Sequence, residues 1–445
     1  MHGGRTQRCY DSSHFTPEYV MEVIIVGAGI GGLTLALTLH QAGIASRVFE
    51  AAPELKPVGV GINILPHATR ELARLGLEPA LAKVGVATRE SAFFNRFGQL
   101  IYREPAGRDA GYEWPQFSIH RGDLQQLLVD AVVLRMGAGA IHTDWRCTGV
   151  DQTERSASAH FIRPTTGETL PPQTADVVIA CDGLHSTVRK QFHPGEGEPL
   201  YSGVNMWRGV SVWPTFLSGA SMVRAGWLAT GKMVIYPIRN GVDPADRQLV
   251  NWVAEIETPR HHQRDWNRRG RLEDFIYAFE DWRFDWLDVP ALIRAADSIL
   301  EFPMIDQDPL PWWTLGRATL LGDAAHPMVP RGSNGAGQAI LDARALTDAL
   351  ADALSSHRDA ARALQDYEAR RREATAAVVR TNRANPPDAI LREVFERTGD
   401  KPFARIEDVI GDDELKAISE RYKRVAGYDR AALAGSPPAS TRSPA

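Results

Sequence analysis

EVIIVGAGIGGLTLALTLHQAGIASRVFE, residues 22–50, begins with a β-branched run from Val23 to Val26 that predicts a buried strand of a parallel sheet. Three glycines follow in the order G-x-G-x-x-G, and the apolar residues after them recur at helical spacing. A second short strand, Ser46 to Phe49, then ends at the acidic residue Glu50. The stretch therefore predicts a strand, a glycine turn, a helix and a second strand.

This unit is typical of a site for the phosphates of a dinucleotide. Gly27 would make the tight turn, Gly29 would let the backbone approach a pyrophosphate, and Gly32 would let the helix pack against the strand. The helix N-terminus favours negative charge through its free N–H groups and its dipole. Glu50 is placed to accept hydrogen bonds from a ribose diol. The predicted contacts of the turn are Gly27, Ala28, Gly29, Gly31 and Gly32.

The composition sets limits on the class of protein. The chain has 445 residues, enough for two or three domains, with 44% hydrophobic and 24% charged residues. The net charge of −5 comes from interspersed signs, so neither nucleic acid nor an anionic membrane is expected as a partner. The three cysteines, Cys9, Cys147 and Cys181, have no metal or redox spacing, which predicts no metal site and fits a reducing cytoplasm.

The ends of the chain are predicted to lie outside the fold. Residues 1–20 are polar and lack an apolar core, which indicates a disordered extension before Met21 rather than a signal peptide. The apolar stretch 23–39 is too short for a membrane span and is broken by glycines. Residues 434–445 are expected to form a flexible tail.

Two stretches in the first half of the chain add candidate ligand contacts. Gly59 and Gly61 are predicted to lie in a loop before a helix from about Pro66 to Leu75, where glycine permits close approach to a flat group. An ordinary turn is an equally good interpretation of this loop. Arg121 precedes a helix for which Asp123 is the predicted N-cap, a position from which a cation can reach phosphate.

Two later strands also end in a carboxylate and a glycine. The strand Thr174 to Ala180 runs into Asp182-Gly183, and a second short strand runs into Gly322-Asp323. Ligands of doubly wound sheets lie at this carboxyl edge, although Asp-Gly can also be a simple turn. Asp323 could accept from a sugar or sugar-alcohol hydroxyl, and His326 is interpreted as structural rather than catalytic. A glycine-rich loop then opens a long helix, and its amides near Asn334 and Gly335 could hold the oxygens of a heterocycle.

Alternating apolar and polar residues rich in Trp and Val predict a separate antiparallel sheet between about Tyr201 and Glu257. Trp207 and Tyr236 on its strands are suited to stacking on a planar ring, although core positions are an equally good interpretation. Arg208 and Arg331 are the nearby cations that could meet a carboxylate. Residues 342–383 and about 389–433 are predicted to be helical.

The three motifs together, GAGIGG with Glu50, Asp182-Gly183 and Gly322-Asp323, resemble those of the class A flavoprotein monooxygenases, the single-component aromatic hydroxylases. The resemblance runs from about Glu22 to about Arg383. The segments PVGVGINI, MWRGV, LVNWV and NGAGQAILDA are similar to the branch of the 5-methylphenazine-1-carboxylate 1-monooxygenases.

The resemblance implies roles for the motif residues. The first motif and Glu50 would bind the ADP half of FAD, with Arg121 near the pyrophosphate. Asp182-Gly183 would serve FAD and the nicotinamide cofactor together, and Asp323 would contact ribityl or ribose hydroxyls.

The implied fold is α/β: a Rossmann-like FAD-binding domain interrupted by a mixed, mainly antiparallel substrate-domain sheet, with C-terminal helices. The expected boundaries are residues 21–90, 120–195 and 300–365 for the FAD-binding domain, 91–119 and 196–299 for the substrate domain, and 366–433 for the C-terminal helices.

The implied activity is hydroxylation of a planar, phenazine-like aromatic acid, with or without loss of its carboxylate. NADH or NADPH and O2 would be the co-substrates, and the reaction would run through a flavin C4a-hydroperoxide. No catalytic side chain is assigned because the flavin carries the chemistry. The nicotinamide cofactor would bind without a Rossmann domain of its own, since the chain has no second complete G-x-G-x-x-G. We expect a cytoplasmic monomer or homodimer.

Three other functions remain open from the sequence. An FAD-dependent dehydrogenase or oxidase would share the fold, and an NAD-dependent dehydrogenase would share the first motif but leave the two later motifs without a purpose. A flavin-binding protein without catalytic activity is the third.

Overall fold

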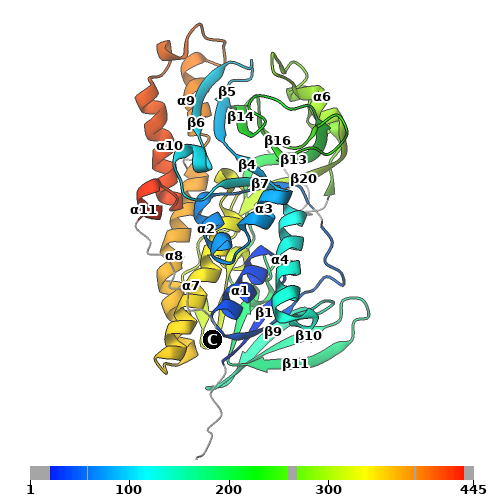
Figure 1. Ribbon diagram of the computed structural model, residues 1–445, viewed down its shortest axis with the longest axis vertical. Helices are drawn as coiled ribbons and strands as arrows, with labels where there is room; N and C mark the ends of the chain where they lie inside the picture. Colours follow the sequence, from blue (N-terminus) through cyan, green and yellow to red (C-terminus); the bar gives the residue numbers. More distant parts are fainter. Residues whose placement is uncertain (1–20, 58, 259–267, 385–386, 435–445) are drawn as a thin grey trace, which may run out of the picture.

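The computed structural model describes residues 21–57, 59–258, 268–384 and 387–434. The predicted N-terminal extension, residues 1–20, and residues 435–445 of the predicted tail lie outside the described residues. Figure 1 shows an elongated molecule with the nucleotide-binding motif in its lower half and a second, large sheet in its upper half. Among the described residues, no helix is both long and apolar enough to cross a membrane.

The lower half is built on a six-stranded sheet in the order β21-β22-β12-β1-β2-β8. The central strand β1 pairs in parallel with β2 on one side and with β12 on the other, as its apolar run predicts. Only the edge pair β21 and β22 is antiparallel. The strands are β1 Glu22–Val26, β2 Ala45–Phe49, β8 Ile141–His142, β12 Val177–Ala180, β21 Thr314–Leu315 and β22 Ala318–Leu320.

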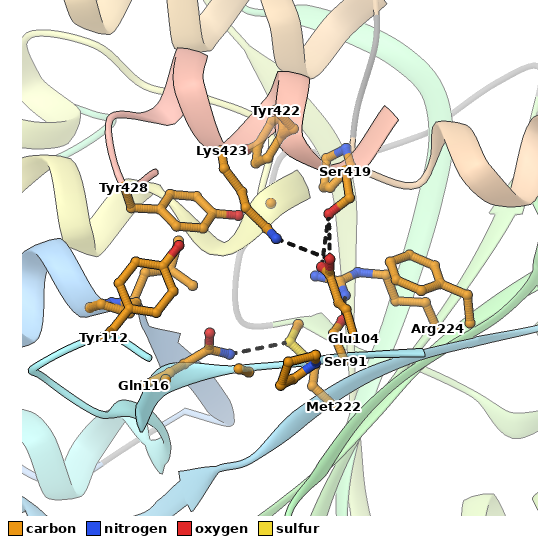
Figure 2. Close-up of a pocket in the computed structure, with 18 residues that line it drawn as sticks. Ser91, Glu104, Tyr112, Gln116, Met222, Arg224, Ser419, Tyr422, Lys423 and Tyr428 are labelled. Atoms are coloured by element: carbon orange, nitrogen blue, oxygen red, sulfur yellow. Dashed lines mark hydrogen bonds and ion pairs between the residues drawn. The ribbon is translucent and has the colours of Figure 1, made fainter. Parts of the chain in front are cut away.

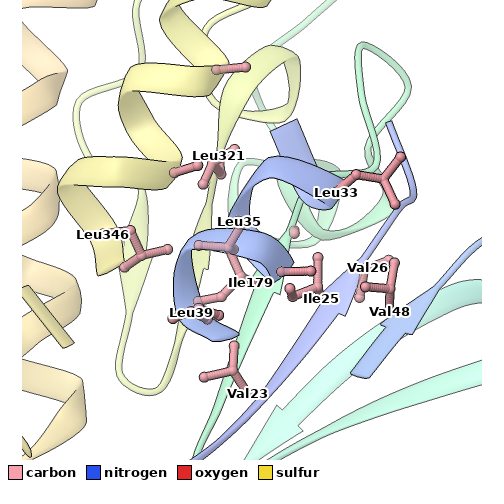
Figure 3. Close-up of a cluster of buried hydrophobic side chains, with 14 of the residues drawn as sticks. Val23, Ile25, Val26, Leu33, Leu35, Leu39, Val48, Ile179, Leu321 and Leu346 are labelled. Carbon is pink, nitrogen blue, oxygen red and sulfur yellow. The ribbon is translucent and has the colours of Figure 1, made fainter. Parts of the chain in front are cut away.

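Helix α1, Ile30–Gln41, follows the glycine turn and is buried along most of its length. It lies between the sheet, α4 (Arg121–Met136) and α7 (Gly335–Ser355), so apolar residues cover more than one of its faces. Figure 3 shows the leucines of α1 packed against the valines and isoleucines of β1 and β12. This packing fixes the helix N-terminus at the carboxyl edge of the sheet.

The upper half contains an eight-stranded sheet in the order β17-β20-β13-β16-β15-β14-β5-β6. The prediction of an antiparallel sheet between about Tyr201 and Glu257 is confirmed, and a parallel pair, β14 with β5, makes the sheet mixed. The expected boundary at residue 300 falls inside β20, which pairs with β13. The strands are β5 Glu90–Phe94, β6 Leu100–Pro105, β13 Leu200–Trp213, β14 Ser221–Trp227, β15 Gly231–Arg239, β16 Gln248–Glu257, β17 Arg268–Arg269 and β20 Ala296–Asp306.

Two three-stranded sheets and a short hairpin complete the strands. In the sheet β3-β7-β4, Gly61 opens β3 and pairs with His120, so the loop predicted at Gly61 is wrong. The sheet β11-β10-β9 projects at the lower end of the molecule (Figure 1). The strands are β3 Gly61–Ile64, β4 Val86–Thr88, β7 Gln116–His120, β9 Arg146–Gln152, β10 Ala157–Ile162, β11 Thr169–Ala175, β18 Arg283–Phe284 and β19 Leu287–Asp288.

The helices differ from the predictions in three places. The predicted helical stretch 389–433 is interrupted, because α9 ends at Thr398 and α10 begins at Asp412. The helix after β7 begins at Arg121, so Asp123 lies in its first turn and pairs with Arg239 instead of capping it. The predicted helix 342–383 is broken, because α7 ends at Ser355 and α8 begins at Ala360. The remaining helices are α2 Pro66–Arg74, α3 Glu78–Val84, α5 Thr187–Phe192, α6 Val289–Arg294, α8 Ala360–Ala384, α9 Ala389–Thr398, α10 Asp412–Ala426 and α11 Arg430–Ala434.

A buried cluster of four charges joins the C-terminal helices to the large sheet. Lys232 Nζ lies 2.6 Å from Asp388 Oδ2 and 3.0 Å from Glu255 Oε2. Arg224 Nε lies 3.1 Å from Asp388 Oδ1, just before α9. Burial alone would raise the pKa of Asp388, but Lys232 and Arg224 outweigh it and hold the pKa below its usual value. Two positive and two negative charges thus compensate each other in the interior.

We expect Asp388→Asn to destabilise the protein by about 3–5 kcal/mol, because it leaves Lys232 and Arg224 buried with less compensation. The matched control is Asp352→Asn, whose partner Arg358 and own carboxylate are both exposed, and which should cost less than about 1 kcal/mol. Urea midpoints of the two variants measure the difference. Equal midpoints would show that the buried cluster is not an anchor.

Candidate active site

The glycine turn depends on very close backbone contacts. Gly27 has a φ of +104°, and a Cβ there would lie 2.4 Å from the carbonyl oxygen of Cys181 at the end of β12. A Cβ on Gly32 would lie 2.1 Å from the carbonyl oxygen of Gly27, so the predicted close packing of helix against strand is observed. The turn therefore brings the ends of β1 and β12 and the start of α1 together.

The remaining side of the turn is open. A Cβ on Gly29 would meet no atom within 4 Å, and the same holds for Gly183 after β12. Gly29 is also the N-cap of α1 and supplies no side chain to its free N–H groups. An open backbone surface at a helix N-terminus fits a pyrophosphate.

Glu50 lies at the turn, as predicted. Its Oε2 accepts the N–H of Ala28 at 2.8 Å, and its Oε1 accepts the N–H of Ala52 at 2.8 Å. Gln125 of α4 donates to the carbonyl oxygen of Ala28 at 2.8 Å, which fixes the turn from the other side. The half-buried carboxylate is thus held in one position beside the phosphate-binding backbone.

Asp182 supplies an acceptor that the protein leaves unused. Its Oδ2 accepts the N–H of Thr187 at 2.8 Å, whereas its buried Oδ1 has no hydrogen-bond partner among the described residues. Burial raises the pKa of this carboxyl. A buried acceptor without a partner is costly, and a hydroxyl of a bound cofactor would satisfy it.

Asp323 lies at the N-terminus of α7, since its Oδ1 is 3.8 Å from the position of a Cβ on Gly335. Its side chain is exposed to solvent although its chain neighbours are buried, and desolvation raises its pKa against the effects of His326 and Arg121. We call the row of accessible residues at the carboxyl edge of the sheet, from the glycine turn through Asp182 to Asp323, the cofactor groove. Asp323 therefore lies beside the N-terminus of α7, as the sequence predicted, and the charge of Arg121 acts on its carboxyl.

The loop that carries Asp323 is held by the buried carboxylate of Asp342. Asp342 accepts from the N–H of Gly322 at 3.2 Å, from Arg371 Nε at 2.7 Å, and lies 2.5 Å from His326 Nε2. Burial raises the pKa of Asp342, but His326 and Arg371 outweigh it, so the pKa lies below its usual value. The structural role predicted for His326 agrees with this contact.

Gly61 is clamped by the large sheet. Its N–H donates to Asn251 Oδ1 at 2.7 Å, and its carbonyl oxygen accepts from Arg208 Nη2 at 2.6 Å and from the Tyr236 hydroxyl at 2.8 Å. The N–H of Arg121 donates to the carbonyl oxygen of Val60 at 2.9 Å. Asn251 was not predicted from the sequence, because its partner lies 190 residues away.

Three of the remaining predicted contacts have other neighbours. Trp207 is 4% exposed and stacks on Phe275 at 5.0 Å, on the sheet face opposite to Arg208, so the predicted substrate stacking by Trp207 is wrong. Asn334 turns its amide nitrogen to the hydroxyl of Tyr422 at 2.7 Å. Arg331 is half-buried and lowers the pKa of Asp388.

Comparison with known proteins identifies the ligand of this groove. The family profile described as FAD binding domain matches residues 20–382. The chain belongs to the class A flavoprotein monooxygenases. It is 43% identical to phenazine 1,6-dicarboxylic acid hydroxylase PhzS of Lysobacter antibioticus over 91% of this chain and 97% of the relative. It is 33% identical to the 3-amino-4-hydroxybenzoate 2-monooxygenase of Streptomyces cremeus over 82% and 86%.

The fold agrees with this assignment. The crystal structure of Klebsiella pneumoniae HpxO with FAD and uric acid superposes with a TM-score of 0.68 at 24% identity, covering 91% of this chain and 92% of that one. The family profile spans all three motifs, so this monooxygenase uses FAD with NADH or NADPH as co-substrate, and an NAD-dependent dehydrogenase is not supported.

We expect Glu50→Ala to weaken FAD retention by about 1–3 kcal/mol, the range for hydrogen bonds to a charged group. Glu54→Ala is the matched control, because Glu54 is exposed and pairs only with the exposed Lys56 in the described structure. Fluorescence titration of the two apoproteins with FAD gives both affinities. Equal losses in the two variants would contradict a role of Glu50 at the ribose.

The raised pKa values of Asp182 and Asp323 predict a pH-dependent affinity for FAD. A hydroxyl donor binds an ionised carboxylate better than a protonated one, so FAD binding releases protons from Asp182 and Asp323. The pKa values of both carboxyls are raised above 3.8. The affinity for FAD therefore falls as the pH falls through these raised pKa values. Asp323→Asn removes one titrating group and should flatten this dependence, as a pH series of FAD titrations measures. An unchanged slope in the variant would show that Asp323 does not bind a cofactor hydroxyl.

Proposed function

We propose that this monooxygenase hydroxylates a planar, polycyclic aromatic acid of the phenazine type, with or without loss of the carboxylate. The observation that carries the proposal is the 43% identity to a phenazine hydroxylase across 97% of that relative's length. The benzoate-type relative is less similar, at 33% identity. A ring system larger than one benzene ring is therefore favoured.

The residues of the chain bind the cofactor, orient the aromatic ring and exclude water from the site. Bound FAD supplies the redox chemistry, since it accepts a hydride from NADH or NADPH and activates O2 for transfer of one oxygen atom to the ring. The glycine turn and Glu50 would hold the ADP half, Asp182 would accept from a cofactor hydroxyl, and Asp323 would do so at the N-terminus of α7.

The clamp on Gly61 has a positioning role in this proposal. Arg208 and Tyr236 both donate to the Gly61 carbonyl oxygen, so the partner of both side chains is the first residue of β3 rather than a free ring. Tyr236 is buried, and burial raises the pKa of its phenol, which keeps the hydroxyl protonated as a donor. The half-buried Arg331, next to the start of α7, remains the candidate cation for a substrate carboxylate.

The proposal includes a cytoplasmic enzyme that acts as a monomer or a homodimer. Cys147 and Cys181 are both free thiols in the described structure, which is compatible with a reducing compartment. An FAD-dependent dehydrogenase or oxidase of the same fold is not favoured, because the similar proteins are named hydroxylases and monooxygenases.

The test is oxidation of NADH and of NADPH by the FAD-loaded enzyme with a panel of aromatic acids, scored by oxygenated product. We expect phenazine-1,6-dicarboxylic acid or a close polycyclic acid to stimulate cofactor oxidation and to gain oxygen. Turnover of monocyclic phenols or benzoates alone would overturn the phenazine-type substrate while leaving the monooxygenase assignment intact. Oxidised ring without incorporated oxygen would favour the dehydrogenase.

A further inference from the structure

Helix α7 begins beside the cofactor groove without the cap that its sequence offers. Its N-cap residue is Asn334, and asparagine is one of the residues whose side chain most often caps a helix. The side chain of Asn334, however, makes no hydrogen bond to the first turn of α7. The N–H groups of this turn, which lies beside the carboxylate of Asp323, are therefore not occupied by their own N-cap side chain.

The hydroxyl of Tyr422 holds the Asn334 side chain in another direction. Asn334 Nδ2 donates to this hydroxyl at 2.7 Å and to the carbonyl oxygen of Gly332 at 3.1 Å. The hydroxyl in turn donates to Asn382 Oδ1 of α8 at 2.9 Å. Asn334 is 1% exposed and Tyr422 is 3% exposed, so these bonds are shielded from bulk water. Burial raises the pKa of Tyr422, which keeps the hydroxyl protonated.

The loop in front of α7 is shaped around the same hydroxyl. Gly332 and Ser333 have positive φ angles of +75° and +59°, a conformation that is uncommon for serine. A Cβ on Gly332 would lie 1.7 Å from the hydroxyl oxygen of Tyr422, so only glycine leaves room for this hydroxyl. The loop also contacts β3, which begins at Gly61. Tyr422 therefore fills a tight turn between β3 and the start of α7.

Helix α10, which carries Tyr422, is itself fixed to its neighbours. Ser419 Oγ and Lys423 Nζ bind the carboxylate of Glu104 on β6 at 2.8 Å and 3.0 Å (Figure 2). At the end of α10, the carbonyl oxygen of Ala426 accepts from Gln338 Nε2 of α7 at 3.3 Å. The helix therefore gives the Tyr422 hydroxyl a fixed position from which it can hold another side chain.

The contact between Asn334 and Tyr422 joins two different parts of the sequence. The family profile ends at residue 382, whereas α10 begins at Asp412. Asp323 and Asn334 thus lie in sequence that the profile covers, and Tyr422 lies beyond it. The match to the family therefore assigns no role to Tyr422, and the geometry has to supply one.

We propose that Tyr422 is a positioning residue whose hydroxyl keeps the Asn334 side chain away from the N-terminus of α7 and so leaves this N-terminus open to FAD. Without the hydroxyl, the Asn334 side chain would cap α7, as asparagine does at other helix starts, and would compete with the cofactor for the free N–H groups. Tyr422 would have this role with any aromatic substrate.

The competition should depend on the redox state of the cofactor. The sequence predicts that the amides near Asn334 and Gly335 hold oxygens of a heterocycle, which in FAD is the flavin ring. The positive end of a helix dipole favours negative charge, and a reduced flavin carries more negative charge than an oxidised one. Closing the N-terminus of α7 should therefore weaken the binding of reduced FAD more than that of oxidised FAD.

The experiment compares wild type, Tyr422→Phe, Asn334→Ala and the double variant, all without an aromatic substrate. Ser419→Ala is the matched control, because it removes a buried hydroxyl of the same helix that binds Glu104 and not the loop. Fluorescence titration of the apoproteins gives the affinity for oxidised FAD. Redox titration of the bound flavin gives its midpoint potential, and urea midpoints give the stability of each variant.

We expect Tyr422→Phe to weaken the binding of oxidised FAD by about threefold to tenfold, the effect of one hydrogen bond, and to lower the midpoint potential. An additional tenfold loss for reduced FAD would lower the potential by about 30 mV, the value for a two-electron couple. In the Asn334→Ala background no side chain is left to compete, so Tyr422→Phe should change neither quantity there. Ser419→Ala should lose stability but bind FAD like the wild type.

Either of two results would overturn the positioning role. If Tyr422→Phe loses stability like Ser419→Ala but keeps the FAD affinity and the potential of the wild type, Tyr422 is a core contact only. If the effects of Tyr422→Phe persist undiminished in the Asn334→Ala background, Tyr422 does not act through Asn334. The proposed substrate is tested separately, because none of these measurements contains an aromatic acid.

Discussion

The active site depends on one close backbone approach, that of Gly27 to Cys181. A side chain at residue 27 would overlap the carbonyl oxygen of Cys181, and one at residue 32 would overlap the carbonyl oxygen of Gly27. These contacts bring the ends of β1 and β12 and the N-terminus of α1 to one point. Glu50 and Asp182 reach the groove only because their strands pair with β1 in register there.

The large sheet and the cofactor groove are coupled through Gly61. Three side chains from β13, β15 and β16 bind the N–H and carbonyl oxygen of this single residue. Val60, the residue before Gly61, accepts a hydrogen bond from the N–H of Arg121. Arg208, which binds the carbonyl oxygen of Gly61, is buried, and burial lowers its pKa. A displacement of these strands would therefore move the backbone at Gly61 and, through the contact between Val60 and Arg121, the start of α4.

The sequence predicted the residues at the carboxyl edge of the parallel sheet in the places where they lie, and it placed those of the large sheet poorly, for a physical reason. Gly27, Glu50, Asp182 and Asp323 each follow a strand in the chain, so local pattern and the carboxyl-edge rule suffice to place them. The position of Trp207 depends on which face of β13 is covered, and the partner of Gly61 depends on the register of a strand almost 200 residues away. The misplaced N-cap at Asp123 has the same origin, because the pairing of His120 with Gly61 makes the helix start directly after β7.

Compensated ion pairs join the C-terminal helices to the large sheet. Asp388, just before α9, is compensated by Lys232 and Arg224 of the sheet, and Lys423 of α10 is compensated by Glu104 of β6. Each of these helices is thus joined to the sheet by ions whose charges compensate each other. Because a buried charge that loses its partner is costly, these pairs fix how α9 and α10 lie on the sheet.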